Sequence, residues 1–247
     1  EYLLEGLMIF VAVTLGYGAE NVREHYVETK KALISAKNLY VDVTYDSIGY
    51  ARTKINRNKQ DSCFEIINAH YNNNKLDKEI PAVYAAHGYM ALRMLHQMNT
   101  LALDEVKNSG TLKFLESDEL KAAIQRYASY TAGLKLREQR EFGYIDRMLD
   151  PISIKHFEFN FFRTALDNLK IDSNKIVVKV PIPTNLKIIK KEQLDWDNYI
   201  AILGMLQTIR KSTDKDYIEP TQEQCHELLT LLRNYLIKHD ALENNNH

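Results

Sequence analysis

Cysteine is scarce in this 247-residue chain, which contains only Cys63 and Cys225. Two cysteines far apart in the sequence exclude a dense disulfide framework. Neither belongs to a CxxC pair, so the chain lacks the usual spacing of a zinc site or of a thiol-exchange centre. The sequence leaves two states open, which are one long-range disulfide and two buried thiols.

Proline and glycine are also few, with five and nine residues respectively. Because both residues interrupt helices, their scarcity favours long helices. Residues 20–60 contain no proline and one glycine, Gly49. We therefore predict an all-α fold. An N-terminal transmembrane helix continues into a long stalk helix, and an irregular helical bundle with at most one short extended segment follows.

A surplus of charge is missing too, because 32 Lys and Arg residues stand beside 33 Asp and Glu residues. Nucleic-acid-binding proteins usually concentrate a basic surplus, so no nucleic-acid partner is expected. The local motifs of catalysis are also absent: HExxH, GxSxG, GxxxxGK and GxGxxG do not occur. His87 and His96 lie about 180° apart on one helix and cannot share a metal ion there. We predict no enzymatic activity, no metal and no cofactor.

The chain contains one long hydrophobic run. Residues 6–19 carry no charge, and Tyr2, Leu3 and Leu4 extend the run across Glu5. A helix needs about 20 mainly apolar residues to cross a bilayer. We interpret residues 1–20 as a transmembrane helix, 21–60 as a juxtamembrane stalk helix and 61–247 as a soluble helical domain. A buried core helix and an uncleaved signal segment are the alternatives.

One face of the predicted membrane helix combines small and charged side chains. At about 100° per residue, a narrow stripe contains Glu5, Ile9, Ala12, Gly16 and Arg23. Ala12 and Gly16 form a small-xxx-small step, which allows two helices to pack closely in lipid. A carboxylate at membrane depth is costly unless it faces a partner or the headgroups. The stripe predicts helix association; small residues placed by chance, with Glu5 among the headgroups, are the alternative.

Signals for further helices follow along the chain. The predicted stalk carries an apolar stripe that must pack on other elements, formed by Tyr26, Leu33, Ala36, Leu39, Tyr40 and Val43. Residues 72–75 predict a loop, and Pro81 suits the first turn of a helix that continues to Leu101. Gly110 predicts a helix end. Ser117 predicts an N-cap for a helix that Pro151 terminates.

The C-terminal part is predicted to contain three more helices and one extended segment. The helices cover residues 155–169, 191–210 and 221–239, and Thr221 with Gln224 fits a capping box for the last one. Residues 175–183 are β-branched and contain Pro181 and Pro183, which favours an edge strand or an extended crossover. The last helix has an apolar stripe of the bundle type, formed by Cys225, Leu228, Leu229, Leu232, Tyr235 and Leu236.

A family resemblance rests on the segment LALDEVKNSGTLKFLESDELKAAIQRYASY, residues 101–130, after an N-terminal helix that begins near a glutamate. The residues that carry it are Leu103, Val106, Lys107, Ser109, Gly110, Leu112, Leu115, Glu119, Leu120 and Tyr127. Over about the first 150 residues the chain resembles an uncharacterised family of single-pass bacterial membrane-anchored helical proteins. The resemblance implies an inner-membrane location and a periplasmic helical domain, and it implies no activity. The cations after the membrane helix oppose this topology, because excess Lys and Arg usually mark the cytoplasmic side.

Aromatic residues near Pro151 are candidates for a ligand pocket, since such pockets are mostly apolar. The candidate lining residues are Tyr127, Tyr130, Phe157, Phe159 and Phe161. Core packing is the competing interpretation and the stronger one. Arg137 and Glu141 lie four residues apart and predict an ion pair on a solvated helix face.

Two functions are expected from these patterns. The first is a membrane-tethered, non-enzymatic interaction or scaffold subunit of an envelope complex. It would form a homo-oligomer or join other membrane subunits through its membrane helix and stalk, with the lipid bilayer as a partner. The alternative is an extracytoplasmic ligand-sensing domain that signals through a separate partner.

Overall fold

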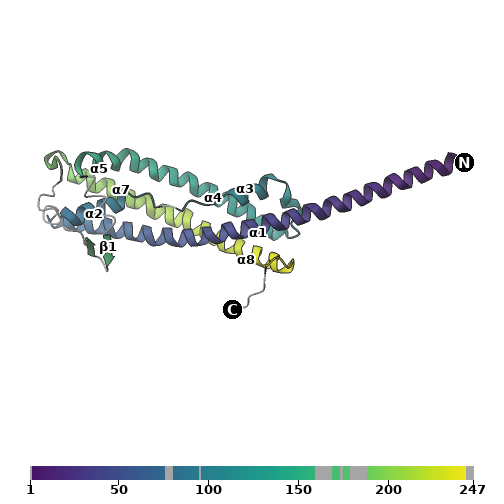
Figure 1. The fold of residues 1–247 in the computed structure, drawn as a ribbon. Coiled ribbons are helices and arrows are strands. Elements are labelled where there is room, and N and C mark those ends of the chain that lie inside the picture. The colour runs from purple at the N-terminus through teal and green to yellow at the C-terminus, as the bar shows by residue number, and fades with distance from the viewer. Residues whose placement is uncertain are drawn as a thin grey trace. The chain divides into compact units, whose positions relative to one another are not determined.

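The protein is predominantly helical, as the composition predicts (Figure 1). The computed structural model describes residues 2–75, 80–94, 96–158, 169–172, 175–178 and 188–242. Its α-helices are α1 (Tyr2–Asn72), α2 (Ile80–Ala91), α3 (Leu101–Asn108), α4 (Asp118–Tyr144), α5 (Asp150–His156), α7 (Trp196–Thr213) and α8 (Glu219–Lys238). Short helical segments are η1 (Thr111–Phe114), η2 (Ile145–Leu149), η3 (Lys191–Gln193) and η4 (Asp214–Ile218).

The chain divides into two compact units. Unit 1 consists of Glu1–Ser47, Met98–Ser129 and Glu223–His247, and unit 2 consists of Ile48–Gln97 and Tyr130–Gln222. The helices α1, α4 and α8 contribute residues to both units.

Helix α1 is a single helix of 71 residues, so the predicted uninterrupted course is confirmed and extends to Asn72. The predicted loop follows, where Asn74 takes a positive φ of 52°. Among the helices that the structure describes, none is both long and apolar enough to cross a membrane, and this includes the N-terminal turns of α1.

Unit 1 buries the middle of α1. Ala36, Leu39 and Val43 of the predicted stalk stripe are buried, whereas Tyr26 is exposed. The apolar stripe of α8 is also buried, at Cys225, Leu228, Leu232, Tyr235 and Leu236. Two polar contacts fix this packing: Tyr127 donates a hydrogen bond to Asp46 at 2.7 Å, and the Cys225 thiol donates to the Val43 carbonyl at 3.5 Å. The predicted helix faces of unit 1 are therefore largely confirmed.

Several local helix signals are confirmed as well. Pro81 lies in the first turn of α2, and Gly110 takes a φ of +73° just beyond α3. The Ser117 hydroxyl accepts a hydrogen bond from the Leu120 N–H at 3.1 Å, which caps α4. The helix predicted to continue to Leu101 instead ends at Ala91, and α3 begins anew at Leu101.

Pro151 does not end a helix, and α8 begins at Glu219 directly after η4 rather than at residue 221, which corrects two predictions. Pro151 and Pro220 each lie two residues after the last residue of a π turn, which is η2 for Pro151 and η4 for Pro220. There the hydrogen bonds reach five residues back, from the Asp150 N–H to Ile145 O and from the Glu219 N–H to Asp214 O. A π turn already interrupts the ordinary backbone ladder, so a proline two residues beyond its end costs little. Thr221 is consequently no N-cap, and its hydroxyl bonds back to Tyr217 O.

Unit 2 has its core between α1, α2, α5 and α7. The core residues include Cys63, Ile67, Val83, Tyr84, Ala86, Met90, Phe157, Tyr199, Leu203 and Leu206. Helix α7 is capped by Asp195, whose carboxylate accepts from the Asn198 N–H at 3.0 Å, so it starts later than residue 191. Cys63 and Cys225 are both buried free thiols, in unit 2 and unit 1 respectively.

Unit 2 also contains two short antiparallel strands, β1 (Leu169–Asp172) and β2 (Lys175–Val178), paired from Leu169↔Val178 to Asp172↔Lys175. Strand β2 agrees with the extended segment predicted from residue 175. The helix predicted over residues 155–169 is wrong at both of its ends, because α5 ends at His156 and Leu169 begins β1. Residues 159–168 lie outside the described residues.

Candidate functional site

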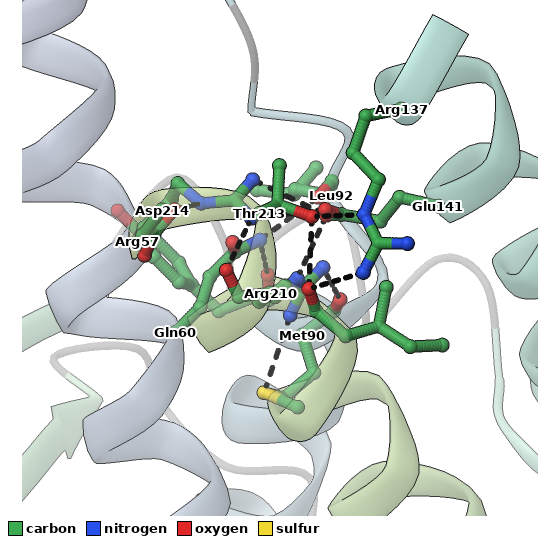
Figure 2. A network of polar contacts seen from close by, with 11 residues as sticks. Arg57, Gln60, Met90, Leu92, Arg137, Glu141, Arg210, Thr213 and Asp214 are labelled. Carbon is green, nitrogen blue, oxygen red and sulfur yellow. Dashed lines mark hydrogen bonds and ion pairs between the residues drawn. The ribbon is translucent and has the colours of Figure 1, made fainter. Parts of the chain in front are cut away.

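The most elaborate polar arrangement in unit 2 joins two arginines to one buried glutamate (Figure 2). Arg57 of α1 donates to both carboxylate oxygens of Glu141 of α4, at 3.3 and 2.9 Å. Arg210 of α7 donates from Nε to the same carboxylate at 3.2 Å. The three side chains are only 2–3% exposed. We call these three residues the arginine network.

The arginine network also completes the C-terminal end of α2. A helix leaves its last carbonyls without helical donors, and these carry partial negative charge. Arg210 donates from Nη2 to Met90 O at 2.7 Å. Gln60 of α1 donates to Tyr89 O at 2.9 Å and to Leu92 O at 2.8 Å. Side chains from α1 and α7 thus replace the donors that a longer α2 would supply, which explains why α2 can end at Ala91.

The same network reaches the π turn η4. Arg57 donates from Nη2 to Arg210 O at 3.1 Å, and its Nε forms an ion pair with Asp214, the first residue of η4. Arg137 of α4 donates to the Thr213 hydroxyl at 3.1 Å and to Ile209 O at 3.4 Å. A π turn loosens the regular ladder around it. Guanidinium groups therefore contact the end of α2 and the π turn η4.

Burial disturbs the titration of the groups around the network. Burial raises the pKa of Glu138 to about 7, and the neighbouring Glu141 carboxylate adds to this shift. Burial raises the pKa of Asp214 to about 6, against the opposing effect of Arg57. Burial lowers the pKa of Arg210, while Glu141 opposes the shift. The prediction that Glu141 lies on a solvated face is wrong, because its partners come from α1 and α7 rather than from Arg137.

The geometry assigns a structural role to the arginine network. Its charged groups contact one another, main-chain carbonyls and the Asp214 carboxylate, and its side chains are closed to solvent. A catalytic group must instead reach a substrate. Arg57 and Arg210 were not singled out by the sequence, because neither has a motif around it and each looks like an ordinary helix cation.

A second buried chain of hydrogen bonds passes through His87 of α2. Its Nδ1 lies 2.9 Å from the Tyr199 hydroxyl, and its Nε2 lies 2.8 Å from the Ser153 hydroxyl. The Ser153 hydroxyl donates to Leu149 O at 3.0 Å. The Phe157 ring stacks on the imidazole at 3.8 Å with an interplanar angle of 6°.

The proton positions in this chain follow from the acceptor at its end. Because Ser153 donates to a carbonyl, its oxygen accepts from His87 Nε2–H, and Nδ1 then accepts from the Tyr199 hydroxyl. Burial lowers the pKa of His87 to about 3, so the imidazole is neutral. With Nε2 already protonated, His87 is not placed to take a proton from Ser153. A serine–histidine nucleophile is therefore not formed.

A pocket of about 560 Å³ lies beside this chain. It is lined by Gly88, Ala91, Leu92, Arg93, Asp150, Ser153, Ile154 and Phe157. Arg93 spans to Asp150 at 2.9 Å and also pairs with Asp146 at the exposed edge. The volume and the mainly apolar lining suit a small organic molecule.

Of the five residues predicted to line a ligand pocket, three are described by the structure, and they do not lie together. Phe157 lines the pocket, and Tyr130 belongs to the same unit but does not line it. Tyr127 belongs to unit 1, where it bonds to Asp46. Phe159 and Phe161 lie outside the described residues.

The predicted membrane-helix stripe is exposed along its described length. Glu5, Ile9, Ala12, Gly16 and Arg23 all belong to the exposed N-terminal turns of α1. Arg23 pairs with Glu20 on the same helix. Within the described residues, no cluster of three or more His, Cys, Asp or Glu side chains is arranged to hold a metal ion.

Comparison with known proteins identifies no relative: no family model, no curated protein and no solved structure matches the chain. The resemblance to an uncharacterised membrane-anchored family therefore stays a prediction.

Replacing Glu141 with Gln should lower the free energy of unfolding of unit 2 by about 3–5 kcal/mol, because two buried guanidinium groups would lose their counter-charge. Urea denaturation followed by circular dichroism measures this loss. Glu227, which pairs with Arg126 at the surface of unit 1, is the matched control, and E227Q should cost less than about 1 kcal/mol. Equal small losses in the two variants would contradict the structural role of the network.

His87 should make stability depend on pH. Its pKa of about 3 in the folded protein lies below its ordinary value of 6.5, so the unfolded chain takes up the proton first as pH falls. The contribution of neutral His87 to the free energy of unfolding is complete above about pH 6.5. It is lost as the pH falls toward 3, by about 1.4 kcal/mol per pH unit. As the pH falls through this range, the free energy of unfolding of the parent should decrease more than that of H87Q, because glutamine does not take up a proton. Denaturation at pH 7, 6 and 5 measures it, and a constant difference would contradict the neutral imidazole.

Proposed function

We propose that this protein is a non-enzymatic, membrane-tethered interaction subunit, attached to a lipid bilayer by the N-terminal turns of α1. The observation that carries the proposal is the exposure of this apolar segment. Its large side chains are 45–76% exposed between Leu7 and Tyr17. In water such a surface is unfavourable by about 25 cal/mol per Å² of apolar area.

The distribution of these side chains favours lipid over a single protein partner. Leu7, Met8, Ile9, Phe10 and Val11 are consecutive and exposed, and consecutive residues point to all sides of a helix. A helix that is apolar all around needs an apolar environment all around. The uncharged residues 6–19 rise about 21 Å, against about 30 Å for a bilayer core. We propose insertion of this segment, with Glu5 directed to the headgroups or to a second helix.

The interaction role extends the same proposal. Ala12 and Gly16 offer a close-packing face on the inserted segment, where a second copy or another membrane subunit would pack. The polar groups buried in unit 2 serve the packing of the fold, which supports a scaffold role over catalysis. Following the family resemblance, we propose the bacterial inner membrane as the location, with the soluble part in the periplasm.

Flotation with vesicles tests the insertion. The full chain, purified in detergent, is mixed with phosphatidylcholine and phosphatidylglycerol vesicles, and the detergent is removed before density-gradient centrifugation. Ile9→Asp should lower the vesicle–water partition coefficient roughly 100-fold, because a carboxylate near the centre of an inserted helix costs about 2.5–3.5 kcal/mol. The fraction of protein that floats with the vesicles should fall accordingly.

The control variant is Tyr26→Asp, which changes an exposed apolar residue of the same helix beyond the uncharged stretch. It should float like the parent protein. If I9D and Y26D float equally well, the segment is not inserted, and the tether proposal is wrong.

A second candidate function is ligand sensing, and the pocket lined by Phe157 is the observation that favours it. A thermal-shift screen of small metabolites should then find compounds that raise the melting temperature. Ile154→Trp, at a pocket residue that is also well exposed, should abolish such shifts. Met205→Trp, at an exposed position of unit 2 away from the pocket lining, should retain them. A screen without any stabilising compound would remove this candidate.

A further inference from the structure

The outward face of α1 in unit 1 carries a row of exposed apolar residues that the tether proposal does not use. Between residues 30 and 47, the exposed positions are Lys30, Lys31, Ile34, Lys37, Asn38, Val41 and Tyr45. The opposite face is buried, at Ala32, Ser35, Ala36, Leu39, Val43 and Asp46. This part of α1 therefore already has its packing partners on one side and presents a second apolar row on the other.

The spacing of this row matches the seam of a coiled coil. Ile34, Val41 and Tyr45 are separated by steps of seven and four residues, and they are 53%, 46% and 66% exposed. Such a 7/4 repeat gives a narrow line that one neighbouring helix can cover, and β-branched residues are typical of it. Unit 2, considered by itself, exposes Ile48 and Ile55 on α1, again seven residues apart.

The charges beside the row have one sign. Lys30, Lys31 and Lys37 are its exposed charges, and the two acidic residues in this stretch are turned to the protein. Lys31 forms an ion pair with Glu28, which precedes the stretch, so Lys30 and Lys37 carry the charge beside the row. Asp42 accepts hydrogen bonds from the Asn99 side chain and the Ala102 N–H, and Asp46 is buried. An apolar row with Lys30 and Lys37 beside it is complementary to a helix with acidic flanks.

We propose that the row of Ile34, Val41 and Tyr45 docks an amphipathic helix of a partner protein, with apolar residues in heptad spacing and glutamates or aspartates beside them. A second copy packed in parallel is disfavoured, because two such faces would bring lysines against lysines. An antiparallel copy would offer no acidic residue of its own exposed row to Lys30 and Lys37. A lipid surface is disfavoured too, because interfacial helices need a wide apolar face rather than a narrow seam. The inference rests on residues 30–47 and is independent of the inserted segment, so either proposal can fail alone.

A pair of synthetic helices tests the docking. Both peptides contain about four heptads with isoleucine and leucine at the core positions, and one carries glutamate and the other lysine at the flanking positions. Binding to the full chain in detergent micelles is measured by fluorescence anisotropy. The acidic peptide should bind at least tenfold more tightly than the basic one, and Val41→Lys should weaken its binding at least tenfold.

Two further variants separate the row from general surface effects. Leu101→Lys changes an apolar residue of unit 1 that is 75% exposed and lies outside the row, and it should bind like the parent. The double variant K30E/K37E should reverse the preference toward the basic peptide. Circular dichroism confirms that each variant is folded.

Three outcomes would overturn the proposal. The first is equal binding of the two peptides, or binding that V41K does not change. The second is a concentration-dependent dimer in sedimentation experiments that V41K abolishes, which would make a second copy the occupant. The third is binding to anionic vesicles that V41K abolishes while I9D does not, which would assign the row to a lipid surface.

Discussion

Two guanidinium groups share one carboxylate in the interior of unit 2, and the ends of several helices depend on this arrangement. Glu141 compensates Arg57 and Arg210, and the remaining N–H groups of these arginines reach the carbonyls of Met90 and Arg210. A buried ion set of this kind adds little net stability over an apolar replacement, but each of its members needs the others. The network therefore contributes more to the specific arrangement of α1, α4 and α7 in unit 2 than to the net stability of the unit.

The two buried hydrogen-bond systems of unit 2 share one property, which is that each ends on main-chain carbonyls. The arginine network ends on Met90 O at the end of α2 and on Arg210 O in the last turn of α7, just before η4. The His87 chain ends on Leu149 O within η2. Carbonyls of this kind become available where a helix stops or changes its repeat. Polar side chains are thus buried where the backbone is irregular, and they are satisfied there. This coupling accounts for the presence of histidine and arginine in a buried core.

The sequence could predict what depends on near neighbours. The Ser117 cap, the Gly110 turn and the α8 stripe are local patterns, and all three are present. Arg57, Glu141 and Arg210 are 84 and 69 residues apart along the chain, so no local pattern could pair them. Glu141 was placed on the surface because Arg137 lies four residues before it, which is the usual surface pairing. The expected helix end at Pro151 is absent because the helix-breaking rule assumes the α-helical repeat on both sides of a proline, and the π turn η2 precedes this one.

The π turns have a geometric consequence for every residue that follows them. A helical turn of five-residue hydrogen bonds adds one residue to the repeat and so rotates all later side chains by about 100° relative to a regular helix. The residues after η2 and η4 are therefore out of phase with those before them, although the chain is α-helical on both sides of each π turn. Each long helical run can in this way present two unrelated faces in succession. A single-residue insertion at such a point changes which partners a helix can meet without breaking the helix itself.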